Sequence, residues 1–110
     1  MAIHIAFYKG EEKLAVVELN KKIYLGRNKE NDVAIDDQSI SGTHCLIEID
    51  PNNFVQVYDL NSKNGIHFGG KRVGSHSLLV DQRLYVGQHH IMIEKSLLTK
   101  AEAFHLRNEK

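Results

Sequence analysis

The chain has 110 residues, 42% hydrophobic and 25% charged, so it has room for a single domain around one core. Its 14 basic residues balance its 14 acidic ones, and no overall field would draw it onto nucleic acid or an anionic membrane. The single cysteine, Cys45, has no partner for an intramolecular disulfide, which favours a reducing compartment.

The N-terminal segment does not resemble a signal peptide, because His4 and Lys9 interrupt its apolar residues. The longest apolar run, residues 14–17, is far shorter than a membrane span. We therefore expect a cytoplasmic protein with no membrane partner.

The predicted strands are marked by hydrophobic residues that recur with a period of two, leaving one face for a core and one for water. In chain order the runs contain Ile3, Ile5 and Phe7; Ile23 and Leu25; Val33 and Ile35; Cys45, Ile47 and Ile49; Val55 and Val57; Leu84 and Val86; and Ile91 and Ile93. Turn-forming residues separate the runs, at 9–12, 50–53, 64–65, 69–70, 74–75 and Gly87. This pattern predicts an all-β fold over residues 1–95, an antiparallel β-sandwich of ten or eleven short strands.

The tail, residues 96–110, has a different pattern. Leu97, Ala101 and Phe104 fall on one face of a helix, and Thr99 is a suitable N-cap. We expect a short C-terminal helix here.

Three segments contain residue types that do not serve a core: 26–32, 41–44 and 59–65. Each follows or precedes a predicted strand, and together they offer a guanidinium, hydroxyl groups, a carboxamide and backbone N–H groups freed by glycine. Loops that join alternate strands of a sandwich cluster at one end. If these three meet there, they form a compact site for a dianion such as phosphate.

Gly26-Arg27, then Ser41-x-x-His44, then Asp59-Leu60-x-Ser62-x-Asn64-Gly65 resembles the signature of the forkhead-associated (FHA) domain family. The similarity covers about residues 3–95. The resemblance implies a module that binds phosphothreonine on a partner protein in Ser/Thr kinase signalling, with no enzymatic activity and no cofactor. We expect it to be monomeric on its own.

Residue roles follow from the same resemblance. Arg27, Ser41 and Lys63 would bind the phosphate, and Gly42, Thr43 and Asn64 would contact the peptide. The supporting residues would be Gly26, His44 and Gly65. Two positions depart from the family pattern, which often has arginine where Gly42 stands and threonine where Lys63 stands.

Because of Gly42, a docking or dimerisation module that binds independently of phosphate remains an alternative. A hydrolase built from Ser41, His44 and Asp59 lacks the usual nucleophile elbow. Binding of single-stranded nucleic acid is disfavoured by scattered aromatics and zero net charge. No metal is expected, since the adjacent His89 and His90 would face opposite sides of a strand.

Overall fold

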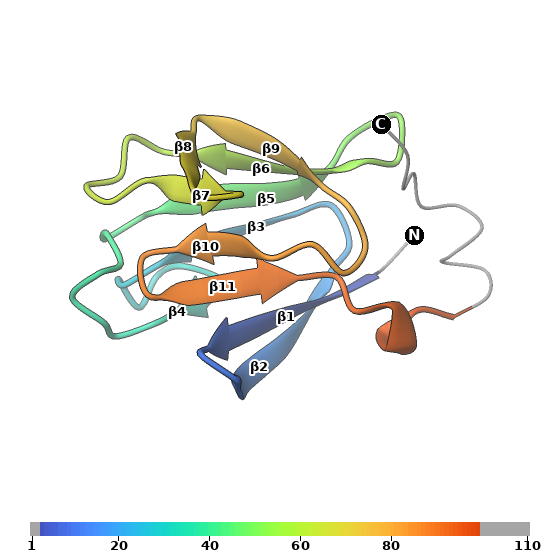
Figure 1. The fold of residues 1–110 in the computed structure, drawn as a ribbon, viewed down its shortest axis with the longest axis horizontal. Helices are drawn as coiled ribbons and strands as arrows, with labels where there is room; N and C mark the ends of the chain where they lie inside the picture. The colour runs from blue at the N-terminus through green and yellow to red at the C-terminus, as the bar shows by residue number, and fades with distance from the viewer. Residues whose placement is uncertain (1–2, 100–110) are drawn as a thin grey trace.

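The computed structural model describes residues 3–99, which form two β-sheets packed face to face (Figure 1). The six-stranded sheet has the order β2 (Glu12–Leu19), β1 (Ile3–Lys9), β11 (His89–Met92), β10 (Leu84–Val86), β7 (Ile66–Phe68) and β8 (Lys71–Val73). The five-stranded sheet has the order β4 (Val33–Ala34), β3 (Lys22–Gly26), β5 (Cys45–Ile49), β6 (Val55–Asp59) and β9 (Ser75–Leu78). These eleven strands confirm the predicted all-β sandwich.

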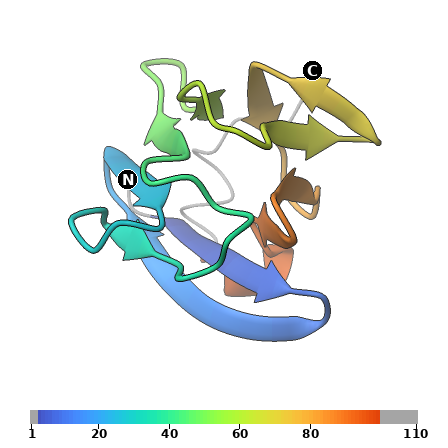
Figure 2. The same ribbon diagram turned by 90° about the vertical axis from the view of Figure 1, so that its left-hand side faces the viewer.

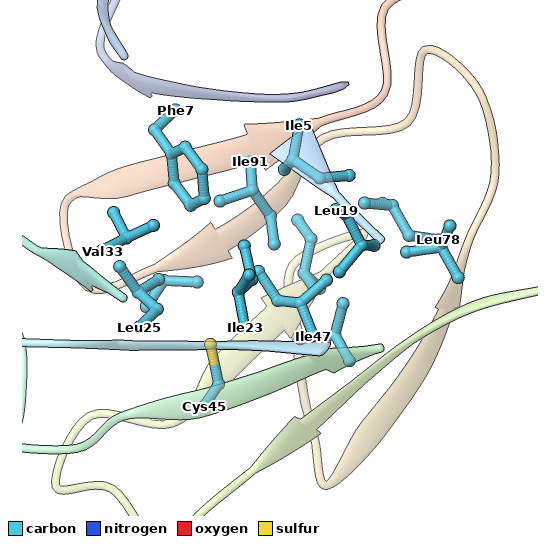
Figure 3. Close-up of a cluster of buried hydrophobic side chains, with 14 of the residues drawn as sticks. Ile5, Phe7, Leu19, Ile23, Leu25, Val33, Cys45, Ile47, Leu78 and Ile91 are labelled. Carbon is cyan, nitrogen blue, oxygen red and sulfur yellow. The ribbon is translucent and has the colours of Figure 1, made fainter. Parts of the chain in front are cut away.

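The core lies between the sheets and is built from the apolar positions of the period-two runs (Figure 3). In the five-stranded sheet, Ile23 pairs with Ile47 and Leu25 pairs with Cys45 across β3 and β5. Phe7 and Ile91 belong to the six-stranded sheet, and both are fully buried. Each such side chain stabilises the fold by about 1.5–3 kcal/mol relative to exposure. The core thereby fixes the register that aligns the loops at the strand ends.

One predicted strand differs from expectation. The run at Val33 and Ile35 forms only the two-residue strand β4, which pairs with β3 in parallel rather than antiparallel orientation. The backbone N–H of Ile35 donates to the carbonyl of Gly26, and the chain then leaves the sheet. Strands β7, β8 and β9 are three or four residues long, too short to show a clear alternation in the sequence.

The expected helix over residues 96–110 lies largely outside the described residues. Its described part contains the last two residues of a 3₁₀ turn, Lys95–Leu97, followed by Leu98 and Thr99 without regular secondary structure, and the helix that Thr99 would cap lies outside the described residues. Within residues 3–99 no helix is long and apolar enough to cross a bilayer.

Cys45, the first residue of β5, has no exposed surface. Burial raises the pKa of its thiol to about 12, with a further contribution from the negative charge of Asp59 on the neighbouring strand. Because the thiolate is the reactive form, we expect an aromatic disulfide reagent at neutral pH to label the native protein at least ~100-fold more slowly than the denatured protein. Absorbance of the released thiol measures both rates, and rapid labelling of the native protein would contradict this burial.

Candidate functional site: a rim of three loops

Three loops lie together at one end of the sandwich, on the left in Figure 1 and facing the viewer in Figure 2. They are the β3–β4 loop (27–32), the β4–β5 loop (35–44) and the β6–β7 loop (60–65), and we call them the rim. The N–H of Arg27 donates to the carbonyl of Ser41 at 2.9 Å. The N–H of Asn28 donates to the carbonyl of Gly42 at 3.0 Å. The N–H of Lys63 donates to the hydroxyl of Ser41 at 3.0 Å. All three sequence motifs therefore meet at Ser41.

The Ser41 hydroxyl has a defined polarity. Its oxygen accepts the N–H of Lys63, and within residues 3–99 the hydroxyl donates no hydrogen bond, so its hydrogen is available to an acceptor outside the protein. Arg27 and Lys63, whose main-chain N–H groups bond to Ser41, have exposed side chains, and within residues 3–99 neither has an ion-pair partner. Thr43 is also exposed, on the same loop as Ser41. The rim thus places a hydroxyl donor and two cations next to solvent.

The side chain of His44 connects the β4–β5 loop to the β6–β7 loop. This side chain is fully buried; Nδ1 accepts the N–H of Ser41 at 3.1 Å, and Nε2 lies 2.8 Å from the carbonyl of Gly65. A carbonyl can only accept, so Nε2 donates to Gly65 while Nδ1 accepts from Ser41. Its main chain adds a bond to Leu25 of β3 and one to Leu60.

These contacts also decide against the triad considered from sequence. Both ring nitrogens of His44 are bonded to main-chain groups, so neither can accept the proton of Ser41. The carboxylate of Asp59 instead accepts the hydroxyl and the N–H of Ser62. Ser41, His44 and Asp59 therefore do not assemble as nucleophile, base and orienting acid. No group of three His, Cys, Asp or Glu side chains within residues 3–99 has the geometry of a metal site.

Two glycines are required by close approach at the rim. A Cβ on Gly26 would collide with the carbonyl oxygen of Gly42 and come within 2.5 Å of the Asn31 amide nitrogen. Gly65 has φ +72°, a conformation that favours glycine, and the guanidinium of Arg72 lies against its Cα. Gly42 differs, since a Cβ there would only touch the flexible side chain of Asn28, at 3.0–3.3 Å.

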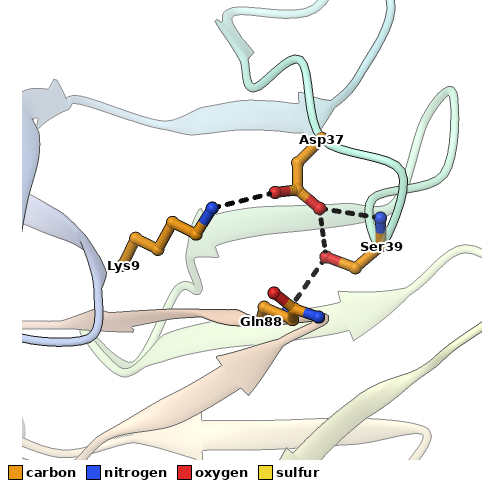
Figure 4. A network of polar contacts seen from close by, with 4 residues as sticks. All are labelled: Lys9, Asp37, Ser39 and Gln88. Atoms are coloured by element: carbon orange, nitrogen blue, oxygen red, sulfur yellow. Dashed lines mark hydrogen bonds and ion pairs between the residues drawn. The ribbon is translucent and has the colours of Figure 1, made fainter.

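Asn64 is held by a network that sequence reasoning missed, of which Figure 4 shows Lys9, Asp37, Ser39 and Gln88. Its Nδ2 donates to the carbonyl of Ser39 at 2.9 Å, which leaves Oδ1 as an acceptor on an exposed residue. Ser39 donates its N–H and hydroxyl to Asp37 at 2.8 and 2.7 Å, and accepts the N–H of Gln88 at 3.0 Å. Lys9 lies 3.6 Å from the same carboxylate. The spacing Asp37-x-Ser39, typical of an Asx turn, was the available signal.

Asn31 is a second residue that the motifs did not single out. Its Nδ2 donates to the carbonyl of Gly42 at 2.6 Å and to that of Asn28 at 2.9 Å. It therefore holds the β3–β4 loop to the β4–β5 loop at Gly42, the position where the family often has arginine.

Replacement of His44 by alanine should destabilise the fold. It leaves the N–H of Ser41 and the carbonyl of Gly65 without partners and opens a cavity. We expect the free energy of unfolding to fall by about 2–4 kcal/mol. Chemical denaturation followed by circular dichroism measures this value, with His67→Ala on β7 as the control. A loss below about 0.5 kcal/mol would show that the imidazole does not support the rim.

Asp37 should contribute to acid sensitivity. The N–H and hydroxyl of Ser39 lower the pKa of its carboxyl, with smaller contributions from His89 and Lys9 and partial opposition from burial. A lowered pKa in the folded state stabilises the fold above the unfolded pKa, and this contribution is lost as the pH falls through the folded pKa.

We therefore expect the stability of Asp37→Asn to depend less on pH than that of the wild type between about pH 4.5 and 2.5. Denaturant midpoints measured across this range test the expectation, with the exposed neighbour variant Asp36→Asn as the control. Identical slopes for wild type and Asp37→Asn would rule out the proposed contribution.

Comparison with known proteins assigns the family. Residues 23–88 match the family model of the FHA domain. The chain therefore belongs to the FHA domain family. A search of curated protein sequences returned no match.

Solved structures share the fold at low sequence identity. The FHA domain of CT664 from Chlamydia trachomatis is 22% identical, with a TM-score of 0.68 over 84% of this chain and 97% of that one. A structure from a study of phosphothreonine-dependent FHA domain interactions is 20% identical, with a TM-score of 0.71 over 83% of this chain and 95% of that one. Mycobacterium tuberculosis EmbR, in complex with a low-affinity phosphopeptide, is 21% identical, with a TM-score of 0.70 over 84% of this chain and 25% of that one.

Proposed function

We propose that this FHA domain is a non-enzymatic, cytoplasmic module that binds a phosphothreonine-containing segment of a partner protein in Ser/Thr kinase signalling. The observation that carries the proposal is the surroundings of Ser41. Its hydroxyl hydrogen is available to an acceptor, and the exposed cations of Arg27 and Lys63 lie on the two loops bonded to it. Hydrogen bonds of this charge-assisted type contribute about 1.5–3 kcal/mol each. The complexes of related FHA domains support the same ligand class.

Asn64, Gly42 and Thr43 would contact the peptide on either side of the phosphorylated residue. Within residues 3–99 the Oδ1 of Asn64 accepts no hydrogen bond, and the bond from Nδ2 to Ser39 holds the amide, so Oδ1 can accept a main-chain N–H of an extended segment. Gly42 and Thr43 follow Ser41 on the adjacent loop and would contact the residues flanking the phosphothreonine. Gly26, His44 and Gly65 would hold the rim in shape, as their contacts indicate.

Replacement of Arg27 by alanine should abolish phosphopeptide binding while leaving the thermal melt nearly unchanged, because the side chain is exposed. Fluorescence polarisation with a degenerate phosphothreonine peptide library measures binding, with matched phosphoserine and unphosphorylated libraries. Arg83→Ala removes the same charge from the exposed residue before β10, a strand that begins at the end of the sandwich opposite the rim (Figure 1), and should bind normally. Wild-type affinity in Arg27→Ala would show that the site is wrong.

The second candidate is a docking or dimerisation module that binds independently of phosphate. The observation that favours it is Gly42, which offers no side chain to a ligand where the family often has arginine. Equal affinity for the phosphorylated and unphosphorylated libraries would select this candidate over the first.

A further inference from the structure

One peptide unit of the rim is bonded at both of its polar ends. The carbonyl of Ser62 accepts a hydrogen bond from Nη2 of Arg72 at 3.0 Å. The N–H of the same unit, which belongs to Lys63, donates to the hydroxyl of Ser41 at 3.0 Å. A guanidinium from β8 and the central hydroxyl of the rim are thus connected through a single planar amide.

Arg72 reaches this position across Gly65. It lies on β8, where it pairs with His67 of β7. A side chain on Gly65 would collide with the Nε atom of Arg72 and come within 2.8 Å of its Cζ. The bare backbone of Gly65 therefore provides the space for the arginine, in addition to its left-handed turn.

The planarity of the amide decides how Arg72 can act. In a trans peptide the C=O and N–H bonds point in opposite directions, so Arg72 and Ser41 lie on opposite sides of the Ser62–Lys63 unit. Because it is bonded to the carbonyl of Ser62, the guanidinium of Arg72 faces away from the hydroxyl of Ser41. Its effect on a ligand at Ser41 must then pass through the amide.

That effect has two physical parts. A charge-assisted hydrogen bond to the carbonyl holds the peptide plane in one orientation and aims the N–H of Lys63 at Ser41. It also polarises the amide, which strengthens the N–H as a donor, as expected for linked hydrogen bonds. With its oxygen engaged in this way, Ser41 presents its hydrogen to the outside.

We propose that Arg72 is a positioning residue for phosphate binding, which orients Ser41 through the Ser62–Lys63 peptide. This inference rests on the proposed function, since Ser41 is the phosphate donor that it serves. The arginine acts on the free protein, before any ligand arrives.

The test is a double-mutant cycle between Arg72 and Ser41. Arg72→Met keeps an unbranched chain over Gly65 and removes the guanidinium, and Lys71→Met removes a charge from the exposed neighbouring position of β8. Each of the two variants is prepared with Ser41 intact and in the Ser41→Ala background. Fluorescence polarisation measures the affinity of every protein for one phosphothreonine peptide selected from the library. Two-dimensional NMR of the free proteins follows the amide proton of Lys63. Arg72→Gln replaces Arg72→Met if the latter lowers the melting temperature.

We expect Arg72→Met to weaken binding about tenfold with Ser41 intact, but less than about twofold in the Ser41→Ala background. Lys71→Met should change affinity less than about twofold in both backgrounds. The amide proton of Lys63 should shift upfield in Arg72→Met, as in Ser41→Ala, because its hydrogen bond weakens.

Unchanged affinity in Arg72→Met would overturn the inference, as would an equal loss in both backgrounds, which would indicate direct contact or a general charge effect. If the wild-type protein does not prefer the phosphorylated peptide, the proposed function fails, and the positioning of the amide is judged by NMR alone. In that case an unmoved Lys63 amide proton would overturn it, and a shifted one would support it.

Discussion

The geometry of the rim depends on the buried imidazole of His44, which connects two loops through their main chains. One ring nitrogen accepts from the N–H of Ser41 and the other donates to the carbonyl of Gly65. Both partners are backbone groups, so the contact fixes the course of the chain rather than a single side chain. The bond from the N–H of Lys63 to the hydroxyl of Ser41 joins the same two loops, whereas Arg27 and Asn28 bond the β3–β4 loop to the β4–β5 loop through the main chain.

A protein with no net charge can still place cations at one site, and three carboxylates at or next to the rim are held by hydrogen bonds to other parts of the protein. Asp32 accepts the N–H of Tyr24, Asp37 accepts two bonds from Ser39, and Asp59 accepts two from Ser62. Each carboxylate thus holds a loop in place, whereas the side chains of Arg27 and Lys63 extend into solvent. The positions of individual charges, not the overall composition, set the field that an arriving anion would meet.

Much of the fold was predictable, because the alternation of residues such as Ile23 and Leu25 is imposed by one buried face. Ser41, His44 and Asn64 could be singled out because they stand in ordered motifs. The parallel pairing of β4 could not be foreseen, since two residues carry no directional pattern. Asn31, Ser39 and the hydrogen bond from Arg72 to Ser62 were missed for a related reason. The contacts that tie them to other parts of the protein are made with residues 10 to 49 positions away, which sheet register and side-chain rotamers bring near. Only the short Asp37-x-Ser39 spacing left a local signal.

The hydrogen bond received by Ser41 comes from the main chain of residue 63, and this has an evolutionary consequence. Every amino acid except proline supplies the same N–H, so the side chain at this site can be exchanged without releasing the serine. A lysine can therefore stand where threonine is frequent in the family. A substitution at residue 63 would change the side chain that a ligand meets, while the main-chain bond to Ser41 is kept.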